Sequence, residues 1–267
     1  MLVPCPEFDD SPYNPSGSVG RIHYEDTAIF ALGSTPSPAK EWYLDAIKNA
    51  KEYIYIENQY FEDDDIVKAL IEWYLSMERQ KSRSEFHAAV VLPRIADPQV
   101  YYQQVAERNI RRIRLATADV VVKDNHGQIR LPRPIGGWGP SGGRLSRTPG
   151  PIVEFQGGIK FYTMIAKNAF EFVYVHAKVG IIDDGYMVGS SNIATQSFRD
   201  DSEADVAVED ANETMIFREK LWMPLVGGFH FVSIREWFNA FATVGGMNPD
   251  REQQGLPPQG LLYEYPL

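Results

Sequence analysis

Short apolar segments of the strand type alternate with amphipathic helical segments along most of this 267-residue chain. Residues 53–56 and 87–92 are rich in aromatic, β-branched and small apolar residues, which is typical of buried strands. Between them, apolar residues recur at helical spacing at Ile66, Leu70, Trp73, Tyr74 and Met77. This alternation predicts an α/β domain with a largely buried sheet.

The first half of the chain also carries signals for the starts of helices. Ser37 and Pro38 suit a helix cap and the first helical position. The acidic run 63–65 favours the amino end of the next helix. We expect a third helix to open at Asp97-Pro98 and to end near Arg114, followed by a short strand at 120–122.

The second half is dominated by strand patterns joined by a turn signal. Asp184-Gly185 favours a two-residue hairpin turn, because both positions tolerate positive φ. Asp210 followed by Glu213 predicts a capping box at the start of a helix that contains Trp222. The tail from Met247 onward is expected to be irregular. The predicted strands of this half cover residues 159–162, 172–175, 179–182, 186–188 and 205–208.

Composition divides the chain into a short lead-in and one domain. Residues 1–20 are rich in Pro, Ser, Gly and Asp and are expected to form a flexible lead-in, with a single domain at 21–267. A Gly/Pro-rich excursion interrupts that domain at 131–158. No signal peptide or membrane-spanning run is seen, so a cytoplasmic or membrane-peripheral location is favoured. The sequence does not decide the compartment or whether the chain is a piece of a longer protein.

Charge and cysteine content exclude several classes of protein. The 44% hydrophobic residues exclude disorder along the whole chain. A single cysteine, Cys5, excludes an internal disulfide framework and a cysteine-built zinc site. The net charge of −10 disfavours a duplex-DNA reader, which normally has a basic surface. A local basic pocket for phosphate remains compatible with this charge.

The segment 175–203 carries the residues suited to chemistry. His176, Lys178 and Asp183 form the pattern H-x-K-x4-D. The first two lie two residues apart on a predicted strand, so their side chains leave the same face. A neutral imidazole can attack phosphorus or pass a proton near neutral pH. An ammonium group beside it can hold the oxygens of a phosphate.

Polar residues on the returning strand complete this candidate site. The predicted hairpin allows Ser190 and Asn192 to join the pocket and bind phosphate oxygens. Glu203 can orient the imidazole of His176 by accepting its second N–H, as carboxylates do in catalytic triads. Asp183 is either a catalytic partner or a residue that pins the hairpin. No cluster with metal-ligand spacing is present, so no metal or cofactor is expected.

These residues resemble the HKD motif of the phospholipase D superfamily. The segment Ile54-Tyr55-Ile56-Glu57-Asn58-Gln59-Tyr60-Phe61 is similar to a strand-end segment in the carboxy-terminal half of phospholipase D enzymes. Val91-Leu92-Pro93 resembles the strand that follows, and 217–227 resembles the closing helix of that half. The likeness covers about residues 20–265. It suggests that Glu57, Asn58 and Gln59 line the pocket, although polar residues also commonly end a strand.

The resemblance implies a fold, a reaction and a partner. The family fold is a mixed β-sheet sandwiched between helical layers. The family reaction is a metal-free phosphodiester cleavage or transfer through a phosphohistidine, in which a second histidine protonates the leaving alcohol. Two HKD motifs are needed, so either a homodimer or a second HKD half is expected. The other histidines lack a lysine two residues on; they are His23, His87, His126 and His230.

Our leading hypothesis is therefore a phospholipase D-type enzyme acting on phospholipid headgroups, with peripheral membrane contact. The alternatives are an HKD nuclease acting as a homodimer and a non-catalytic half that binds phosphate or membrane. Nucleic acid is the less favoured partner, because the net charge of −10 repels it. The arginine-rich segment at 108–114 is either a solvated helix face or a contact to the phosphates of lipid or nucleic acid. Trp138 either packs on the domain or serves at a membrane interface or over the active site.

Overall fold

The computed structural model describes residues 22–24, 27–31, 37–79, 86–94, 100–117, 122–123, 129–130 and 159–266. The lead-in at 1–20, the excursion at 131–158 with Trp138, and the predicted helix start at Asp97-Pro98 lie outside the described residues. The helices are α1 (Pro38–Asn49), α2 (Asp64–Arg79), α3 (Val100–Thr117), α4 (Thr195–Arg199), α5 (Ala211–Leu225) and α6 (Ile234–Gln253). The strands of the first half are β1 (Ile22–Tyr24), β2 (Thr27–Ala31), β3 (Tyr53–Asn58), β4 (His87–Val91), β5 (Val122–Lys123) and β6 (Ile129–Arg130). Those of the second half are β7 (Lys160–Ile165), β8 (Phe172–Val173), β9 (Lys178–Ile182), β10 (Gly185–Gly189), β11 (Ala204–Glu209) and β12 (Leu262–Glu264).

One mixed sheet of ten strands organises the described part of the chain. Its strand order is β1-β2-β11-β10-β9-β3-β4-β7-β12, with β8 paired to β7. The pairs β3–β4 and β4–β7 are parallel, whereas β9 runs antiparallel to β3. The middle of the sheet therefore joins strands from both halves of the sequence. Strands β5 and β6 form a separate antiparallel pair.

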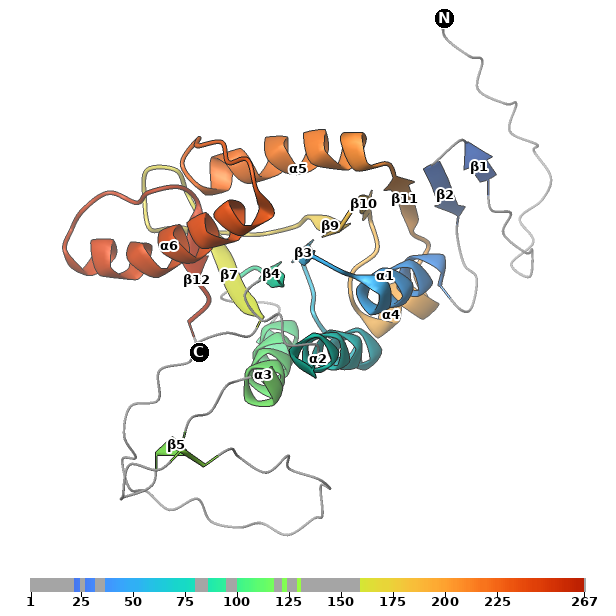
Figure 1. Cartoon of the computed structure of the whole chain (residues 1–267), viewed down its shortest axis with the longest axis horizontal. Coiled ribbons are helices and arrows are strands. Elements are labelled where there is room, and N and C mark those ends of the chain that lie inside the picture. Colours follow the sequence, from blue (N-terminus) through green and yellow to red (C-terminus); the bar gives the residue numbers. More distant parts are fainter. Residues whose placement is uncertain are drawn as a thin grey trace, which may run out of the picture.

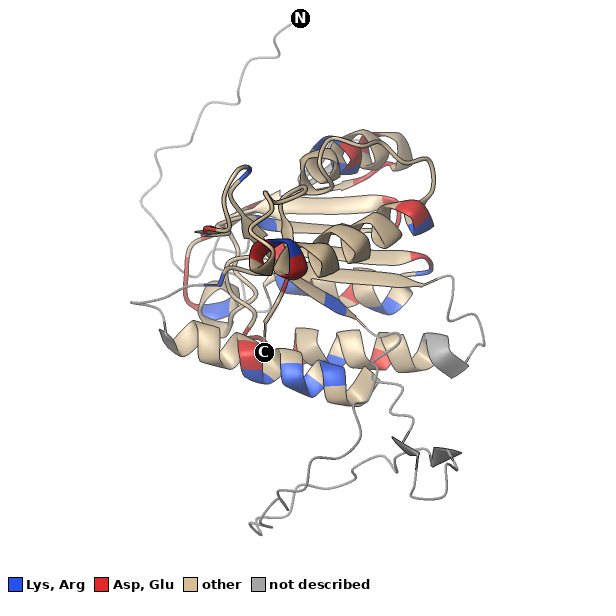
Figure 2. Cartoon of the chain, turned by 90° about the vertical axis from the view of Figure 1, so that its left-hand side faces the viewer, with Lys and Arg blue, Asp and Glu red and all other residues tan. Residues whose placement is uncertain are grey.

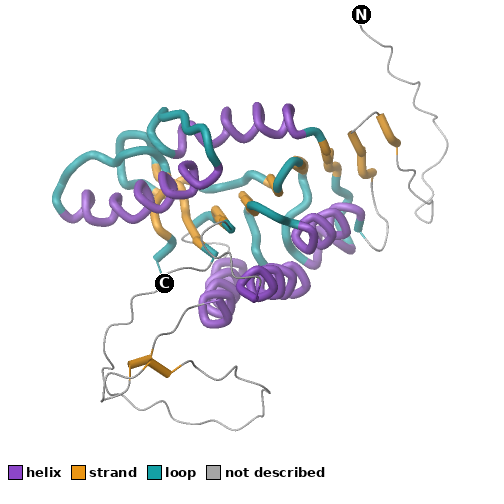
Figure 3. The backbone as a smooth tube through the Cα atoms, viewed as in Figure 1, coloured by secondary structure: helices purple, strands orange, loops and turns teal. Residues whose placement is uncertain are grey.

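Helices cover both faces of this sheet (Figure 1). Helices α1, α2 and α3 lie on one side, and α5 and α6 lie on the other, an arrangement that is also visible in the tube view (Figure 3). This is an α/β fold with a mixed sheet between helical layers, so the fold predicted from the sequence is confirmed. None of the helices in the described ranges is long and apolar enough to cross a membrane.

The central strand β3 shows why the sheet is covered on both sides. All six of its residues are buried. Ile54 and Ile56 belong to the core beneath α1, α2 and α3, whereas Tyr53 and Tyr55 belong to the core beneath α5 and α6. Successive side chains on a strand point to opposite faces, so an apolar strand without polar alternation needs a helical layer on each face.

The helix starts follow from local polar residues. The Ser37 hydroxyl accepts a hydrogen bond from the backbone N–H of Lys40 (3.4 Å), and Pro38 takes the first helical position of α1. The Asp210 carboxylate accepts a hydrogen bond from the backbone N–H of Glu213 (2.8 Å) at the start of α5. The cap predicted for α1 is confirmed, whereas of the capping box predicted at Asp210 and Glu213 the described contacts include only the hydrogen bond to the Asp210 side chain. Each cap gives a partner to one of the N–H groups that a helix start leaves unpaired.

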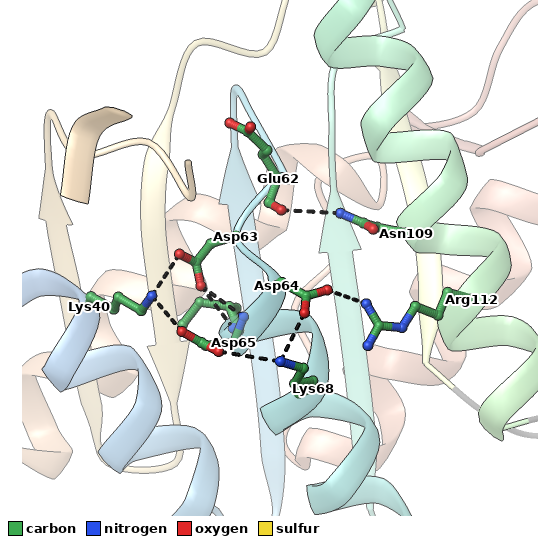
Figure 4. A network of polar contacts seen from close by, with 9 residues as sticks. Lys40, Glu62, Asp63, Asp64, Asp65, Lys68, Asn109 and Arg112 are labelled. Carbon is green, nitrogen blue, oxygen red and sulfur yellow. Dashed lines mark hydrogen bonds and ion pairs between the residues drawn. The ribbon is translucent and has the colours of Figure 1, made fainter. Parts of the chain in front are cut away.

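A polar network connects α1, α2 and α3, which lie on the same side of the sheet (Figure 4). The Lys40 ammonium on α1 donates to the carboxylates of Asp63 and Asp65, each at 2.8 Å. Asp63 also accepts hydrogen bonds from the backbone N–H groups of Asp65 (3.0 Å) and Ile66 (3.1 Å), so it caps α2. Arg112 on α3 pairs with Asp64. The acidic run at 63–65 therefore begins α2, as predicted, and also binds the neighbouring helices.

The arginine-rich segment on α3 is largely paired within the protein. Arg111 lies 3.5 Å from Glu107, and Arg112 contacts Asp64. Arg114 donates to the backbone oxygen of Tyr265 (3.3 Å). Basic and acidic positions accordingly occur close together in this helical layer (Figure 2). These contacts favour the interpretation of the segment as a helix surface over that of an anion-binding face.

Three details of the second half differ from the prediction. The hairpin turn consists of Asp183 and Asp184, and Gly185 already begins β10 opposite Ile182. The strand predicted at 172–175 ends at Val173. The tail is not irregular, because α6 extends to Gln253 and β12 pairs with β7. The tail prediction was wrong because the helical signal of 234–253 is interrupted by Gly and Pro, while packing of residues such as Phe241 and Val244 against the sheet stabilises the helix.

Candidate active site

Four strand ends meet at one edge of the sheet and bring the predicted site residues together. The end of β3 lies opposite the start of β9, with Asn58 in register with Lys178. The end of β10 lies opposite the start of β11, with Gly189 in register with Asp205. Because β9 and β10 are paired, these two junctions are neighbours. His176, Gln59, Ser190 and Glu203 extend from these ends, so the edge collects polar side chains.

Lys178 is the buried cation of this edge. Only 6% of its surface is exposed. Its Nζ donates to the side-chain oxygen of Gln59 (2.8 Å) and to the backbone oxygen of His176 (2.9 Å), and it lies 3.2 Å from Nδ1 of the His176 ring. Burial lowers the pKa of Lys178, while the nearby charge of Glu203 acts in the opposite direction. An ammonium with three short contacts is held in one place and is well positioned to meet an anion.

His176 is exposed and lies directly beside this ammonium. Its imidazole ring stacks on the ring of Tyr174, with centroids 5.8 Å apart and planes inclined by 30°. Lys178 approaches Nδ1, which leaves Nε2 as the ring nitrogen directed away from the ammonium. The predicted pair of imidazole and ammonium is therefore assembled. Such a pair offers a nucleophile or proton donor next to a positive charge.

Glu203 and Ser190 interact with each other at the neighbouring junction. The Ser190 hydroxyl donates to the Glu203 carboxylate and accepts the backbone N–H of Ala204 (2.9 Å). The structure places no hydrogen bond between Glu203 and His176; the contact to Nδ1 comes from Lys178 instead. Glu203 is still close enough to act on the charge of Lys178. Its orienting role at the imidazole stays a prediction.

The loop that carries Asn192 is shaped by two buried side chains. Asn58 is fully buried, and its side-chain oxygen accepts the backbone N–H of Ile193 (3.0 Å). Asp205 is also buried and accepts hydrogen bonds from the hydroxyl and the N–H of Ser191. The side-chain oxygen of Asn192 is buried and has no hydrogen-bond partner among the described residues. Asn58 thus supports the loop and does not line the pocket, while Asn192 retains an unpaired polar atom.

Glu57 alternates with Tyr53 and Tyr55 along β3 and therefore lies on the face of the sheet that α5 and α6 cover. It is 2% exposed, and its carboxyl group accepts a hydrogen bond from the Tyr55 hydroxyl. Burial raises the pKa of Glu57 to about 7, although the hydrogen bond from Tyr55 acts to lower it. Of the three residues predicted to line the pocket, only Gln59 contacts the HKD side chains.

Asp183 is not part of this edge. It lies in the turn at the far end of β9, five residues after Lys178. Its carboxylate accepts the backbone N–H groups of Lys51 (2.6 Å), Glu52 (2.9 Å) and Tyr53 (3.0 Å). Asp183 also has a φ of 48°, a conformation that aspartate tolerates better than most residues. Of the two roles predicted for Asp183, these contacts favour the structural one, because an extended strand separates the carboxylate from His176; its catalytic role stays a prediction.

Sequence reasoning missed three residues that shape the site. Tyr174 stacks on His176, and Asp205 and Ser191 fix the loop before α4. Tyr174 could have been found from its position two residues before the histidine, on the same side of an extended segment. The pairing of Asp205 with Ser191 depends on strand register, which the sequence alone does not fix. No group of three or more metal-binding side chains occurs in the described ranges.

Residues 151–223 match the family model described as the phospholipase D-like domain of cardiolipin synthase. This segment contains His176, Lys178, Asn192 and Glu203. The chain is also 26% identical over 231 residues to a curated phospholipase D of Phytophthora infestans, covering 78% of this chain. The chain spans 12% of the length of that relative. These matches confirm the predicted resemblance to the phospholipase D superfamily, a group of phosphodiesterases.

Several solved structures are similar to this chain at low sequence identity, and two of them are described here. The phospholipase D family member Nuc of Salmonella typhimurium is 17% identical with a TM-score of 0.44, covering 73% of this chain and 91% of that one. The phosphatidylserine synthase of Haemophilus influenzae is 10% identical with a TM-score of 0.44, covering 94% of this chain and 49% of that one.

Proposed function

We propose that this chain is a phospholipase D-type phosphodiesterase unit that cleaves or transfers phospholipid headgroups through a phosphohistidine at His176. The observation that carries the proposal is the exposed imidazole of His176 held beside the buried ammonium of Lys178. The match of this segment to a phospholipase D-like domain supports the same chemistry. The lipid preference rests on the names of the relatives.

The proposed reaction has two displacements. In the first, an imidazole nitrogen attacks phosphorus, a P–N bond forms, and the P–O bond to the leaving alcohol breaks while a second histidine gives that oxygen a proton. In the second, water or another alcohol loses its proton to the second histidine and attacks phosphorus, and the P–N bond breaks. Lys178 stabilises the charge on the phosphate oxygens in both displacements. Asn192, whose buried side-chain oxygen has no partner in the described ranges, would bind through its amide N–H groups.

The second histidine must come from outside the motif described here. We propose that it is supplied either by a second copy of this chain or by another HKD half. In a symmetric dimer the same edge of the sheet would meet itself across a two-fold axis. Two Lys178 ammonium groups would then converge, so phosphate or vanadate bound between them should stabilise the assembly. Sedimentation of the purified chain with and without vanadate tests this arrangement.

Replacement of His176 tests the proposed chemistry. His176→Ala should reduce phosphodiesterase activity by several orders of magnitude, since the nucleophile or acid is lost. Because His176 is exposed, the melting temperature should stay unchanged. His230→Ala is the matched control, as His230 is also exposed and pairs with Glu219 (3.2 Å) away from the HKD residues. Activity is measured on phosphatidylcholine vesicles and on single-stranded DNA.

The outcomes separate the three hypotheses. Lipid cleavage that disappears only in His176→Ala supports the phospholipase. Cleavage of single-stranded DNA without cleavage of lipid would refute the phospholipase hypothesis and support the nuclease hypothesis. Binding of phosphate without turnover of either substrate, in a chain that sediments as a monomer, supports a non-catalytic half. A folded His176→Ala variant that keeps more than about a tenth of the wild-type turnover would refute the role of His176.

A further inference from the structure

The loop between β10 and α4 is held by hydrogen bonds from two buried side chains. Asp205, which is 4% exposed, accepts the backbone N–H (3.1 Å) and the hydroxyl of Ser191. Asn58, which is 0% exposed, accepts the backbone N–H of Ile193 (3.0 Å), and its side-chain N–H donates to the backbone oxygen of Ser191 (3.5 Å). The residues on either side of Asn192 are therefore each fixed by a buried polar group.

Backbone contacts and a glycine complete this support. The backbone oxygen of Ile193 accepts the N–H groups of Glu62 (2.7 Å) and Asp63 (3.2 Å). Gly189 lies opposite Asp205 in the β10–β11 register, and a Cβ at this position would lie 2.1 Å from the Asp205 carboxylate. The missing side chain thus leaves room for the carboxylate beneath the loop. Connecting segments are usually the mobile parts of a protein, whereas this one is bonded to the core along its length.

The sheet topology places this loop at the start of β9. Strand β9 lies between β10 and β3 in the sheet. The loop leaves β10, and Ile193 forms an isolated bridge with Phe61, which follows β3. The loop therefore crosses the edge of the sheet at the start of β9, which is Lys178. Asn192 belongs to the part of the loop that makes this crossing.

We propose that Asn58 and Asp205 are positioning residues that hold Asn192 beside Lys178, so that both side chains are in place for the same phosphate before it binds. A phosphate oxygen accepts hydrogen bonds, so it can meet only the N–H groups of the Asn192 amide. A loop that is already ordered loses less conformational entropy on binding than a loop that must be ordered by its ligand. Neither Asn58 nor Asp205 touches the phosphate in this scheme. The inference rests on the proposed function, because it concerns the phosphate site of that reaction.

A positioning role makes the effects of Asn58 and Asp205 on phosphate binding depend on Asn192. Asn192→Ala should weaken the binding of inorganic phosphate about ten- to a hundredfold, the range for one hydrogen bond to a charged group. Asn58→Ala and Asp205→Ala should each weaken it by no more than Asn192→Ala does. Combined with Asn192→Ala, each should add less than about twofold, because residues that act through one side chain are not additive. A merely structural role would give losses that add.

Calorimetric titration of the full chain with inorganic phosphate measures these affinities. The matched control is Asn248→Ala, because Asn248 is also 0% exposed and holds the segment between α6 and β12. Its side chain donates to the backbone oxygens of Gln259 (3.0 Å) and Leu262 (2.6 Å) and accepts the N–H of Gln259 (2.9 Å). Asn248→Ala should lower the melting temperature as Asn58→Ala does, but leave the phosphate affinity within about twofold of the wild type. Asp205→Asn keeps an acceptor for the Ser191 N–H and should recover most of the affinity that Asp205→Ala loses.

Amide hydrogen exchange of the wild type gives a second readout, which does not depend on whether the variants fold. The N–H groups of Ser191 and Ile193 should exchange about as slowly as those of β9. Their exchange should be the same with and without phosphate, because the loop is already fixed in the free chain.

Four results would overturn the inference. They are exchange at Ser191 and Ile193 more than about a hundredfold faster than in β9, a wild type that binds no phosphate, a folded Asn58→Ala variant with wild-type affinity, and additive losses in the double variants. A chain that shows the expected phosphate pattern but cleaves neither lipid nor DNA refutes the proposed function and supports the inference. Cleavage that requires His176, together with any of the four results, refutes the inference alone.

Discussion

Substitution of Asp183 tests whether this residue of the HKD motif has a structural or a catalytic role. Its carboxylate binds three consecutive backbone N–H groups, those of Lys51, Glu52 and Tyr53, and thereby ties the β9–β10 turn to the segment between α1 and β3. We predict that Asp183→Ala destabilises the chain and leaves the turnover of each folded molecule within about threefold of the wild type.

The magnitude follows from the three hydrogen bonds. A bond to a charged acceptor contributes about 1.5–3 kcal/mol when it is protected from water and less when it is exposed. The bond from Tyr53 is partly buried, whereas those from Lys51 and Glu52 are exposed. The expected loss is therefore about 3 kcal/mol for Asp183→Ala, or a melting temperature lower by roughly 5–10 °C. Asp183→Gly should lose about 1 kcal/mol less, because glycine accepts the φ of 48° without strain.

The assay combines thermal unfolding with activity measured well below the melting temperature. Asp183→Asn is the matched control, because it keeps one acceptor oxygen and should lie between wild type and Asp183→Ala in stability. An Asp183→Ala variant that melts like the wild type but has lost turnover by a hundredfold or more would refute the structural assignment and restore the catalytic one.

Three further predictions follow from the packing and the charges. Gly246→Ala should raise the free energy of unfolding by about 0.5–1 kcal/mol, because alanine favours a helix and nothing lies within 4 Å of the added carbon. Gly245→Ala should lower the free energy of unfolding, because its added carbon would lie 2.5 Å from the Tyr162 ring. Equal effects of the two substitutions in thermal unfolding would contradict this prediction. The pKa of Glu57 is raised to about 7, so the folded chain keeps this proton at a higher pH than the unfolded chain does. The free energy of unfolding of the wild type should therefore fall as the pH rises from about 4.5 to 7. The fall should be about 3 kcal/mol larger than in Glu57→Gln, which has no proton to lose. Parallel pH profiles of the two proteins in urea unfolding would rule this out. EDTA should leave phosphodiesterase activity unchanged if the reaction uses a phosphohistidine; complete loss that a divalent ion restores would argue against that route.

The sequence predicted the sheet, and the proximity of His176 and Lys178, for physical reasons that can be identified. The apolar run at 53–56 has no polar alternation, so burial on both faces was already indicated. The spacing of His176 and Lys178 placed both side chains on one side of an extended segment, and the structure brings them within 3.2 Å. Local patterns were sufficient for these features, because strand alternation and helix capping act over a few residues.

The features that the sequence did not predict depend on long-range pairing. Asp183 could have faced the histidine or a neighbouring loop, and only the β3–β9 pairing places the N–H groups of Lys51, Glu52 and Tyr53 around its carboxylate. The helical tail was missed because Gly245, Gly246 and Pro249 weaken the helical signal, which packing on the sheet outweighs.

The order of strands at the centre of the sheet also determines when the site can form during synthesis. Strand β3 lies between β4 and β9, and the Gln59–Lys178 bond joins residues 119 positions apart. At about 5–20 residues per second, Lys178 is added roughly 6–24 s after Gln59. During that interval β3 lacks the strand that covers its second edge, and an unpaired apolar edge is prone to join other chains. The same pairing that assembles the site therefore makes the nascent chain vulnerable to aggregation until β9 has been made.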